Sequence, residues 1–143
     1  MNNEQIRLVR ESFKQIEPVA QEAGVLFYVK LFKLDPALRR LFKGKMNEQA
    51  DKLMQMIGLA VSGLDRIEEL LPQLRALGAR HSAYGVEDRH YETVGTALLW
   101  TLEQALGEDF TAETKEAWTE VYGWLTQTMK EGSRLREKTV SPV

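Results

Sequence analysis

The sequence predicts an all-α protein with one domain. Each long segment spaces its apolar residues three or four apart, and no segment alternates apolar and polar residues as a strand does. The 143 residues are 43% hydrophobic and 28% charged, which is typical of a globular domain that buries a core without disulfides. We expect an orthogonal bundle of six or seven helices over residues 1–132, followed by a polar, disordered tail at residues 133–143.

The first predicted elements begin and end at residues that favour helix boundaries. Asn3 is the expected N-cap of an amphipathic helix that runs from about residue 4 to residue 16. Pro18 opens the second helix, which ends ahead of Pro36 because proline disfavours helical backbone in the residue before it. A short turn then ends near Phe42.

Four more helical segments follow in the sequence. Asn47 is the expected cap of the next helix, and a capping box at residues 65–68 leads into a short helix that Pro72 restarts. The last two helices begin near Asp88 and after a Thr111 cap.

Composition excludes several classes of function. The absence of cysteine removes disulfides, thiolate chemistry and iron–sulfur clusters, and two histidines are too few for a multi-histidine metal site. A net charge of −2 does not indicate the basic surface that nucleic-acid binding requires. No apolar run approaches the roughly 18 residues of a membrane span, and the N-terminus has no signal-peptide pattern. We expect a cytoplasmic protein without nucleic-acid or membrane partners.

Two polar side chains lie on apolar helix faces, 32 residues apart. His81 is either a buried histidine that bonds a backbone carbonyl or an axial ligand to haem iron, with the Leu77 carbonyl as the expected partner of its other ring nitrogen. Gln49 is either a boundary residue or a donor to a bound ligand. Tyr28 either packs as an ordinary amphipathic side chain or offers its hydroxyl as a second donor to the same region. Gly78 would leave room for a flat macrocycle.

Five residues have a distinctive order and spacing: Pro36, Phe42, Gln49, Leu53 and His81. This order and spacing resemble those of the globin family. The local sequence in residues 26–32, 80–86, 90–95 and 117–123 is similar to that of a single-domain bacterial haemoglobin of the flavohaemoglobin lineage, and the similarity covers residues 4–131. This resemblance implies a globin fold, the 3-over-3 orthogonal helical sandwich, and haem b as the cofactor.

The resemblance also implies roles for individual residues. His81 matches the proximal ligand of the iron, Phe42 the residue that stacks on the porphyrin, and Tyr28 and Gln49 the distal polar pair. Arg80 falls where the family often places a cation near a haem propionate. Further pocket positions match Leu53, Val86, Val94 and Leu98. Tyr91 matches a tyrosine that joins the proximal histidine and a glutamate in a hydrogen-bond network.

The chain departs from the flavohaemoglobin pattern in that network. Ser133 stands where the glutamate is expected, and the nearest acid, Glu131, lies two residues earlier on another helix face. Such a network makes the imidazole more anionic and favours O–O cleavage. Its loss favours reversible ligand binding. His90 begins the helix after His81, so ligation of iron by two histidines is not expected.

Three functions remain open from the sequence. The first is a monomeric or weakly dimeric haemoglobin that reversibly binds O2 and other diatomic ligands such as CO and NO. The second is an NO dioxygenase served by a separate flavin and NADH reductase, which would dock on the basic region of Arg39, Arg40, Lys43 and Lys45. The third is a sensor module, either cofactor-free or haem-based.

Overall fold

The computed structural model describes the backbone of residues 1–140 and the side chains of residues 1–134. Six α helices and three short 3-10 helices follow one another, and no strand occurs in this part of the chain. The elements are α1 (Asn3–Ile16), η1 (Glu17–Val19), α2 (Ala20–Leu34), η2 (Pro36–Leu41), α3 (Met46–Ser62), α4 (Ile67–Ala83), α5 (Asp88–Leu106), η3 (Gly107–Asp109) and α6 (Ala112–Val140). The predicted all-α class is confirmed.

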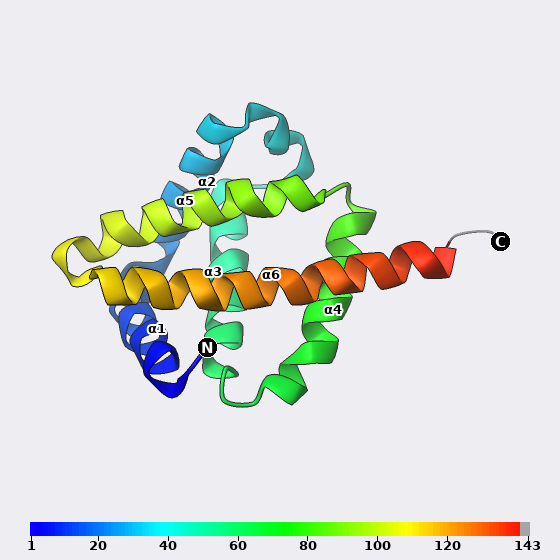
Figure 1. The fold of residues 1–143 in the computed structure, drawn as a ribbon. Coiled ribbons are helices and arrows are strands. Elements are labelled where there is room, and N and C mark those ends of the chain that lie inside the picture. Colours follow the sequence, from blue (N-terminus) through cyan, green and yellow to red (C-terminus); the bar gives the residue numbers. More distant parts are fainter. Residues whose placement is uncertain (141–143) are drawn as a thin grey trace.

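The helices form two layers of three. Helices α5 and α6 run side by side and cross α3 and α4 at a steep angle (Figure 1). Helix α2 packs on α5 and on α3, whereas α1 packs on α6. Helices α3 and α4 make almost no direct contact, although they are consecutive in the chain. The space between them is therefore filled or lined by side chains from several elements.

The main core lies at the end of the sandwich where α1 meets α6. Its fully buried side chains include Val9, Ile16 and Val121. The buried indole of Trp118 donates a hydrogen bond of 2.8 Å to Ser12 Oγ, which joins α6 to α1. Burial of these apolar side chains, with the indole N–H satisfied, stabilises the packing at this end of the sandwich.

Two glycines allow α4 and α6 to touch backbone to backbone. A Cβ on Gly78 would lie 1.9 Å from the carbonyl oxygen of Met129, and a Cβ on Gly132 would lie 1.9 Å from that of Arg75. Both distances are far below van der Waals contact, so only glycine fits. The sequence interpretation of Gly78 as space for a macrocycle is wrong, because a side chain at this position would point at the backbone of α6.

The caps of the first and third α helices differ from the prediction. Asn2, not Asn3, caps α1, because its side chain accepts from the Gln5 backbone N–H while Gln5 bonds back. Helix α3 begins at Met46, one residue before Asn47, without a side-chain cap. The Thr111 cap is confirmed by the hydrogen bond of 3.2 Å from Thr114 N to Thr111 Oγ1.

Helices α4 and α6 are both longer than the sequence suggests. Helix α4 is continuous through Pro72, the residue at which the sequence predicted that a helix restarts. Pro72 has no N–H to donate, but packing against α6 holds α4 on both sides of it. Residues 133–140 of the expected tail continue α6, and Ser133 is buried. Residues 141–143 of the expected tail lie outside the described residues. None of the described helices is long and apolar enough to cross a membrane.

Candidate functional site

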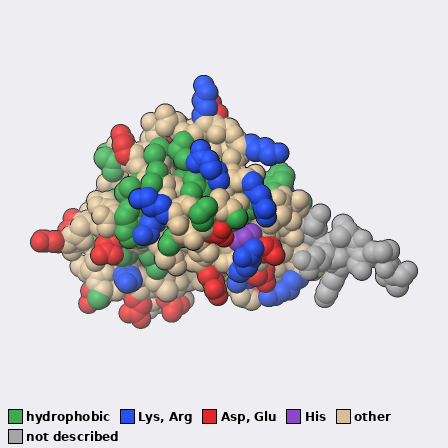
Figure 2. All heavy atoms as spheres, turned by 90° about the horizontal axis from the view of Figure 1, so that it is seen from above, with side chains coloured by type: hydrophobic (Ala, Val, Ile, Leu, Met, Phe, Trp, Pro, Cys, Tyr) green, Lys and Arg blue, Asp and Glu red, His purple; other side chains and the backbone are tan. Residues whose placement is uncertain are grey.

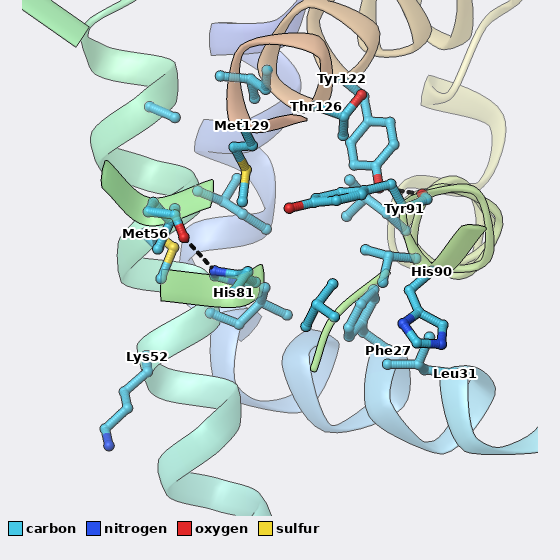
Figure 3. Close-up of a pocket in the computed structure, with 18 of the residues that line it drawn as sticks. Phe27, Leu31, Lys52, Met56, His81, His90, Tyr91, Tyr122, Thr126 and Met129 are labelled. Carbon is cyan, nitrogen blue, oxygen red and sulfur yellow. Dashed lines mark hydrogen bonds between the residues drawn. The ribbon is translucent and has the colours of Figure 1, made fainter. Parts of the chain in front are cut away.

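A cavity of about 340 Å³ lies between α3 and α4. Its volume falls in the range of small-molecule and cofactor pockets, roughly 300–1,000 Å³. The wall is almost entirely apolar, and no carboxylate from the described residues lines it. Side chains from α2, η2, α5 and α6 complete the wall, and Figure 3 shows several of them converging on the space. An apolar cavity with few polar groups is suited to a large, mostly apolar ligand.

His81 is one of those few polar groups. The side chain is half-buried in the cavity wall, and its Nδ1 atom lies 2.8 Å from the Leu77 carbonyl oxygen (Figure 3). The predicted partner is confirmed. A carbonyl only accepts, so Nδ1 carries the proton and Nε2 keeps a free lone pair. Burial lowers the pKa of His81, the Leu77 bond opposes that shift, and the Arg80 charge adds to it. The imidazole is therefore a neutral ligand donor at neutral pH.

Tyr28 lies in the wall of the same cavity. It is 4% exposed, and its ring packs edge to face on Phe42, with the centroids 5.2 Å apart, and on Phe27. Burial raises the pKa of the Tyr28 hydroxyl to about 12. The hydroxyl therefore stays protonated, and able to donate, far above neutral pH.

Gln49 also lines the cavity, half-buried on α3. Its Nε2 atom donates a hydrogen bond of 2.6 Å to the carbonyl oxygen of Lys43, in the loop before α3. Leu53, one turn later, lines the cavity as expected. Lys52 lies at the edge of the cavity with its ammonium group pointing away from it (Figure 3). The Gln49 amide is therefore within the site but is partly engaged by the loop.

Tyr91 brings an unpaired hydroxyl to the side of His81. It is 7% exposed, its hydroxyl has no hydrogen-bond partner among the described residues, and it points into the cavity toward Met129 and His81 (Figure 3). Burial raises the pKa of Tyr91, and the Asp88 carboxylate adds to the effect. Ser133 lies close enough to oppose this shift, but its own hydroxyl donates to the Gly78 carbonyl over 3.0 Å.

The acid nearest in sequence to this region turns away from it. Glu131 pairs with Arg75 on α4, with a nitrogen–oxygen distance of 3.5 Å. Ser133, where a glutamate was expected, is buried beside Tyr91. The described residues thus place no carboxylate next to His81, in line with the departure noted in the sequence.

The remaining predicted positions divide into two groups. Five of them line the cavity: Phe42, Leu53, Val86, Val94 and Leu98. Arg80 is exposed and is not part of the wall. His90 lies in the wall beside Phe27 and Leu31, apart from His81, and its Nδ1 accepts a hydrogen bond of 2.9 Å from Glu87 N (Figure 3).

Sequence reasoning missed several contributors to the wall. Met56 and Thr126 line the cavity, and Met129 extends into it from α6. Met129 follows Tyr122 and Leu125 at helical spacing along α6, and all three line the cavity, so this spacing was a usable signal. The contact of Gln49 with the Lys43 carbonyl could not be predicted from the sequence. Every residue has a backbone carbonyl, so the residue type at position 43 does not indicate this contact.

Comparison with known proteins supports one family. The family model described as Globin matches residues 25–129. Neuroglobins of Danio rerio and Tetraodon nigroviridis are each 32% identical to this chain, over 87% of its length and 87% of theirs. A crystal structure of a hexacoordinated heme protein from an anhydrobiotic tardigrade has a TM-score of 0.84 at 22% identity, covering 94% of this chain and 96% of that one. The last likeness shows the fold, and with the sequence matches it establishes that the chain belongs to the globin family.

Proposed function

We propose that this chain holds haem b in the cavity between α3 and α4 and binds O2 reversibly. The observation that carries the proposal is the state of His81, which has its Nδ1 proton bonded to Leu77 and a free Nε2 lone pair in an apolar wall. A histidine that binds metal through one ring nitrogen commonly donates its other ring N–H to such an acceptor, which fixes the tautomer and the ring orientation. Phe42 would lie against the macrocycle, and exposed Arg80 would pair with a propionate outside the wall.

The donor set of the cavity fits such a group. The wall offers one neutral imidazole and a large apolar surface, and these two features suit an iron porphyrin. The described residues contain no cluster of three or more histidine or acidic side chains that would instead hold a bare metal ion. When bound, haem would supply the iron to which a diatomic gas attaches.

Tyr28 and Gln49 would stabilise the gas by hydrogen bonding. Both line the cavity, and both carry protons that an electron-rich oxygen atom can accept. The Tyr28 hydroxyl keeps its proton because burial raises its pKa to about 12. Two donors favour slow O2 release and high affinity.

The surroundings of His81 favour reversible binding over O–O cleavage. The Nδ1 proton of His81 is donated to a backbone carbonyl, and Glu131 is paired with Arg75. Among the described residues, no carboxylate therefore accepts the Nδ1 proton. A neutral imidazole donates less electron density to iron than an imidazolate-like one.

Absorbance spectra and O2 kinetics test the proposal. The chain expressed with adequate haem should show a Soret band that shifts on reduction and again on adding CO. A chain without that band would instead be a cofactor-free module, such as a sensor. Tyr28→Phe and Gln49→Leu together should speed O2 dissociation, and an unchanged rate would exclude the two residues as donors.

NO dioxygenation is a second candidate, favoured by the charge on one face. The basic residues Arg39, Arg40, Lys43 and Lys45 are exposed and form no ion pair with the described residues. Lys and Arg side chains flank an apolar area on the face seen in Figure 2. A separate flavin and NADH reductase with an acidic surface would dock there, as the resemblance to flavohaemoglobins suggests. Steady-state NO consumption with a generic reductase should then exceed that of free haem.

A further inference from the structure

The amide of Gln49 is held by the loop that precedes α3. Its Nε2 atom lies 2.6 Å from the Lys43 carbonyl oxygen, a short distance for an N–H···O bond. Gln49 also lines the cavity, so one side chain contacts both the loop and the site. The two hydrogens of its NH2 group share one nitrogen, and turning the amide toward a ligand in the cavity changes its geometry at Lys43.

The position of the Lys43 carbonyl depends on Gly44. Gly44 has φ of +110°, a backbone conformation that residues with a side chain rarely adopt. A Cβ on Gly44 would lie 3.6 Å from Gln49 Nε2, which is ordinary van der Waals contact. Replacing Gly44 by alanine would therefore act by straining the turn and moving the Lys43 carbonyl, with no steric collision against the Gln49 side chain.

We infer that Gly44 is a positioning residue for Gln49, and that the Lys43 carbonyl competes with a bound gas for the Gln49 amide. The inference rests on the proposed function, because the competitor is the gas ligand of the cavity. Tyr28 is then the main donor, and the loop of residues 43–45 sets how far Gln49 adds to it. Loosening this turn strengthens the hold on the ligand.

O2 dissociation from the haem-loaded full chain tests the competition. Gly44→Ala is measured with Gln49 present and in a Gln49→Leu background. Release of one hydrogen-bond donor toward the ligand should slow dissociation roughly three- to tenfold when Gln49 is present. The same change should have no effect in the Gln49→Leu background. Equal effects in both backgrounds, or no effect in either, would overturn the inference.

A matched glycine controls for general strain. Gly107 also has a positive φ, +57°, but a Cβ there would meet no atom within 4 Å, and it lies at the corner between α5 and η3. Gly107→Ala should leave the O2 dissociation rate unchanged. If Gly44→Ala does not load haem, Gly44→Asn replaces it, because asparagine tolerates positive φ better and should give a smaller effect in the same direction.

NMR of the ferrous CO complex tests the hydrogen bond without measuring O2. The side-chain NH2 resonances of Gln49 are assigned by their loss in Gln49→Leu. Gly44→Ala should move the Lys43-bonded proton upfield, and Gly107→Ala should not. An unmoved resonance overturns the role of Gly44 even if O2 binds. A chain that gives the shift yet binds no O2 keeps the positioning of Gln49 but contradicts the proposed function.

Discussion

The Nδ1 atom of His81 donates to the Leu77 carbonyl oxygen, one helical turn earlier, over 2.8 Å. This contact fixes the tautomer and orients the ring, because a carbonyl accepts only from a protonated nitrogen. It leaves Nε2 as the atom with a free lone pair on a side chain that lines the cavity. Burial adds to the effect by lowering the pKa of His81, so the ring does not need to lose a proton before it binds a metal.

Replacing His81 by glycine should release haem and create a site for free imidazole. The loss of supporting hydrogen bonds around a metal ligand typically costs 10- to 100-fold in affinity, so loss of the ligand itself should exceed about 100-fold. Haem transfer to an acceptor protein measures the affinity, and added imidazole should restore the spectrum. His90→Gln is the control, because His90 bonds to Glu87 N, and it should retain haem. Equal loss in both variants would contradict the role of His81.

Tyr28→Phe should speed O2 dissociation more than Gln49→Leu does. The Tyr28 hydroxyl is buried beside Phe42, whereas the Gln49 amide is shared with the Lys43 carbonyl. Loss of a donor to a partly charged acceptor costs about 1.5–3 kcal/mol, which corresponds to roughly ten- to a hundredfold in rate. Stopped-flow displacement of O2 by CO measures both variants. The reverse order would make Gln49 the main donor.

The O2 dissociation rate should be independent of pH from about pH 7 to about pH 10. An ordinary tyrosine has a pKa near 10 and would be half ionised at the upper end of this range. Burial raises the pKa of Tyr28 to about 12, so its hydroxyl keeps the proton that it donates. The rate should rise only as the pH approaches 12. Tyr28→Phe should lack that rise, and a rise near pH 10 in the unmodified chain would show an unshifted hydroxyl.

Helical spacing predicted the all-α class, because the inward stripe of a helix is readable one residue at a time. His81 and Gln49 were visible for the same reason, as polar residues on apolar faces. The pocket positions Val86, Val94 and Leu98 came instead from the resemblance to globins. The continuity of α4 through Pro72 was not readable, because packing against α6 overrides the local preference. The contact of Gln49 with Lys43 was hidden too, since it joins a side chain to a backbone atom. Which helix Gly78 faces depends on the tertiary arrangement.

Gly78→Ala should destabilise the fold, and Gly123→Ala should not. A Cβ on Gly78 would lie 1.9 Å from the Met129 carbonyl oxygen, so α4 and α6 would have to separate. Overpacking of this kind costs about 1–3 kcal/mol, and backbone atoms yield less than side chains do. Gly123 lies within α6, and a Cβ added there would meet no atom within 4 Å, so alanine at this position should raise the free energy of unfolding by ~0.5–1 kcal/mol. Urea unfolding of the haem-loaded variants gives both free energies, and equal values would show that the helices adjust freely.

Ser133→Glu should lower the reduction potential of the bound haem. Ser133 is buried beside the unpaired Tyr91 hydroxyl, and its Oγ bonds the Gly78 carbonyl, three residues before His81. A carboxylate there would accept from Tyr91, which offsets part of the cost of burying it. Its negative charge near the ligand would favour the ferric state, and a shift of ~60 mV would correspond to ~1.4 kcal/mol for one electron.

Ser133→Gln is the matched control for this charge. Glutamine has nearly the same shape as glutamate and the same reach toward Tyr91, but it carries no charge. Potentiometric titration should therefore place Ser133→Gln close to the unmodified chain and Ser133→Glu below it, with the difference shrinking as the carboxyl is protonated at lower pH. Equal potentials for the two variants would mean that this position does not act on His81. The choice of serine would then bear only on the packing of α4 against α6.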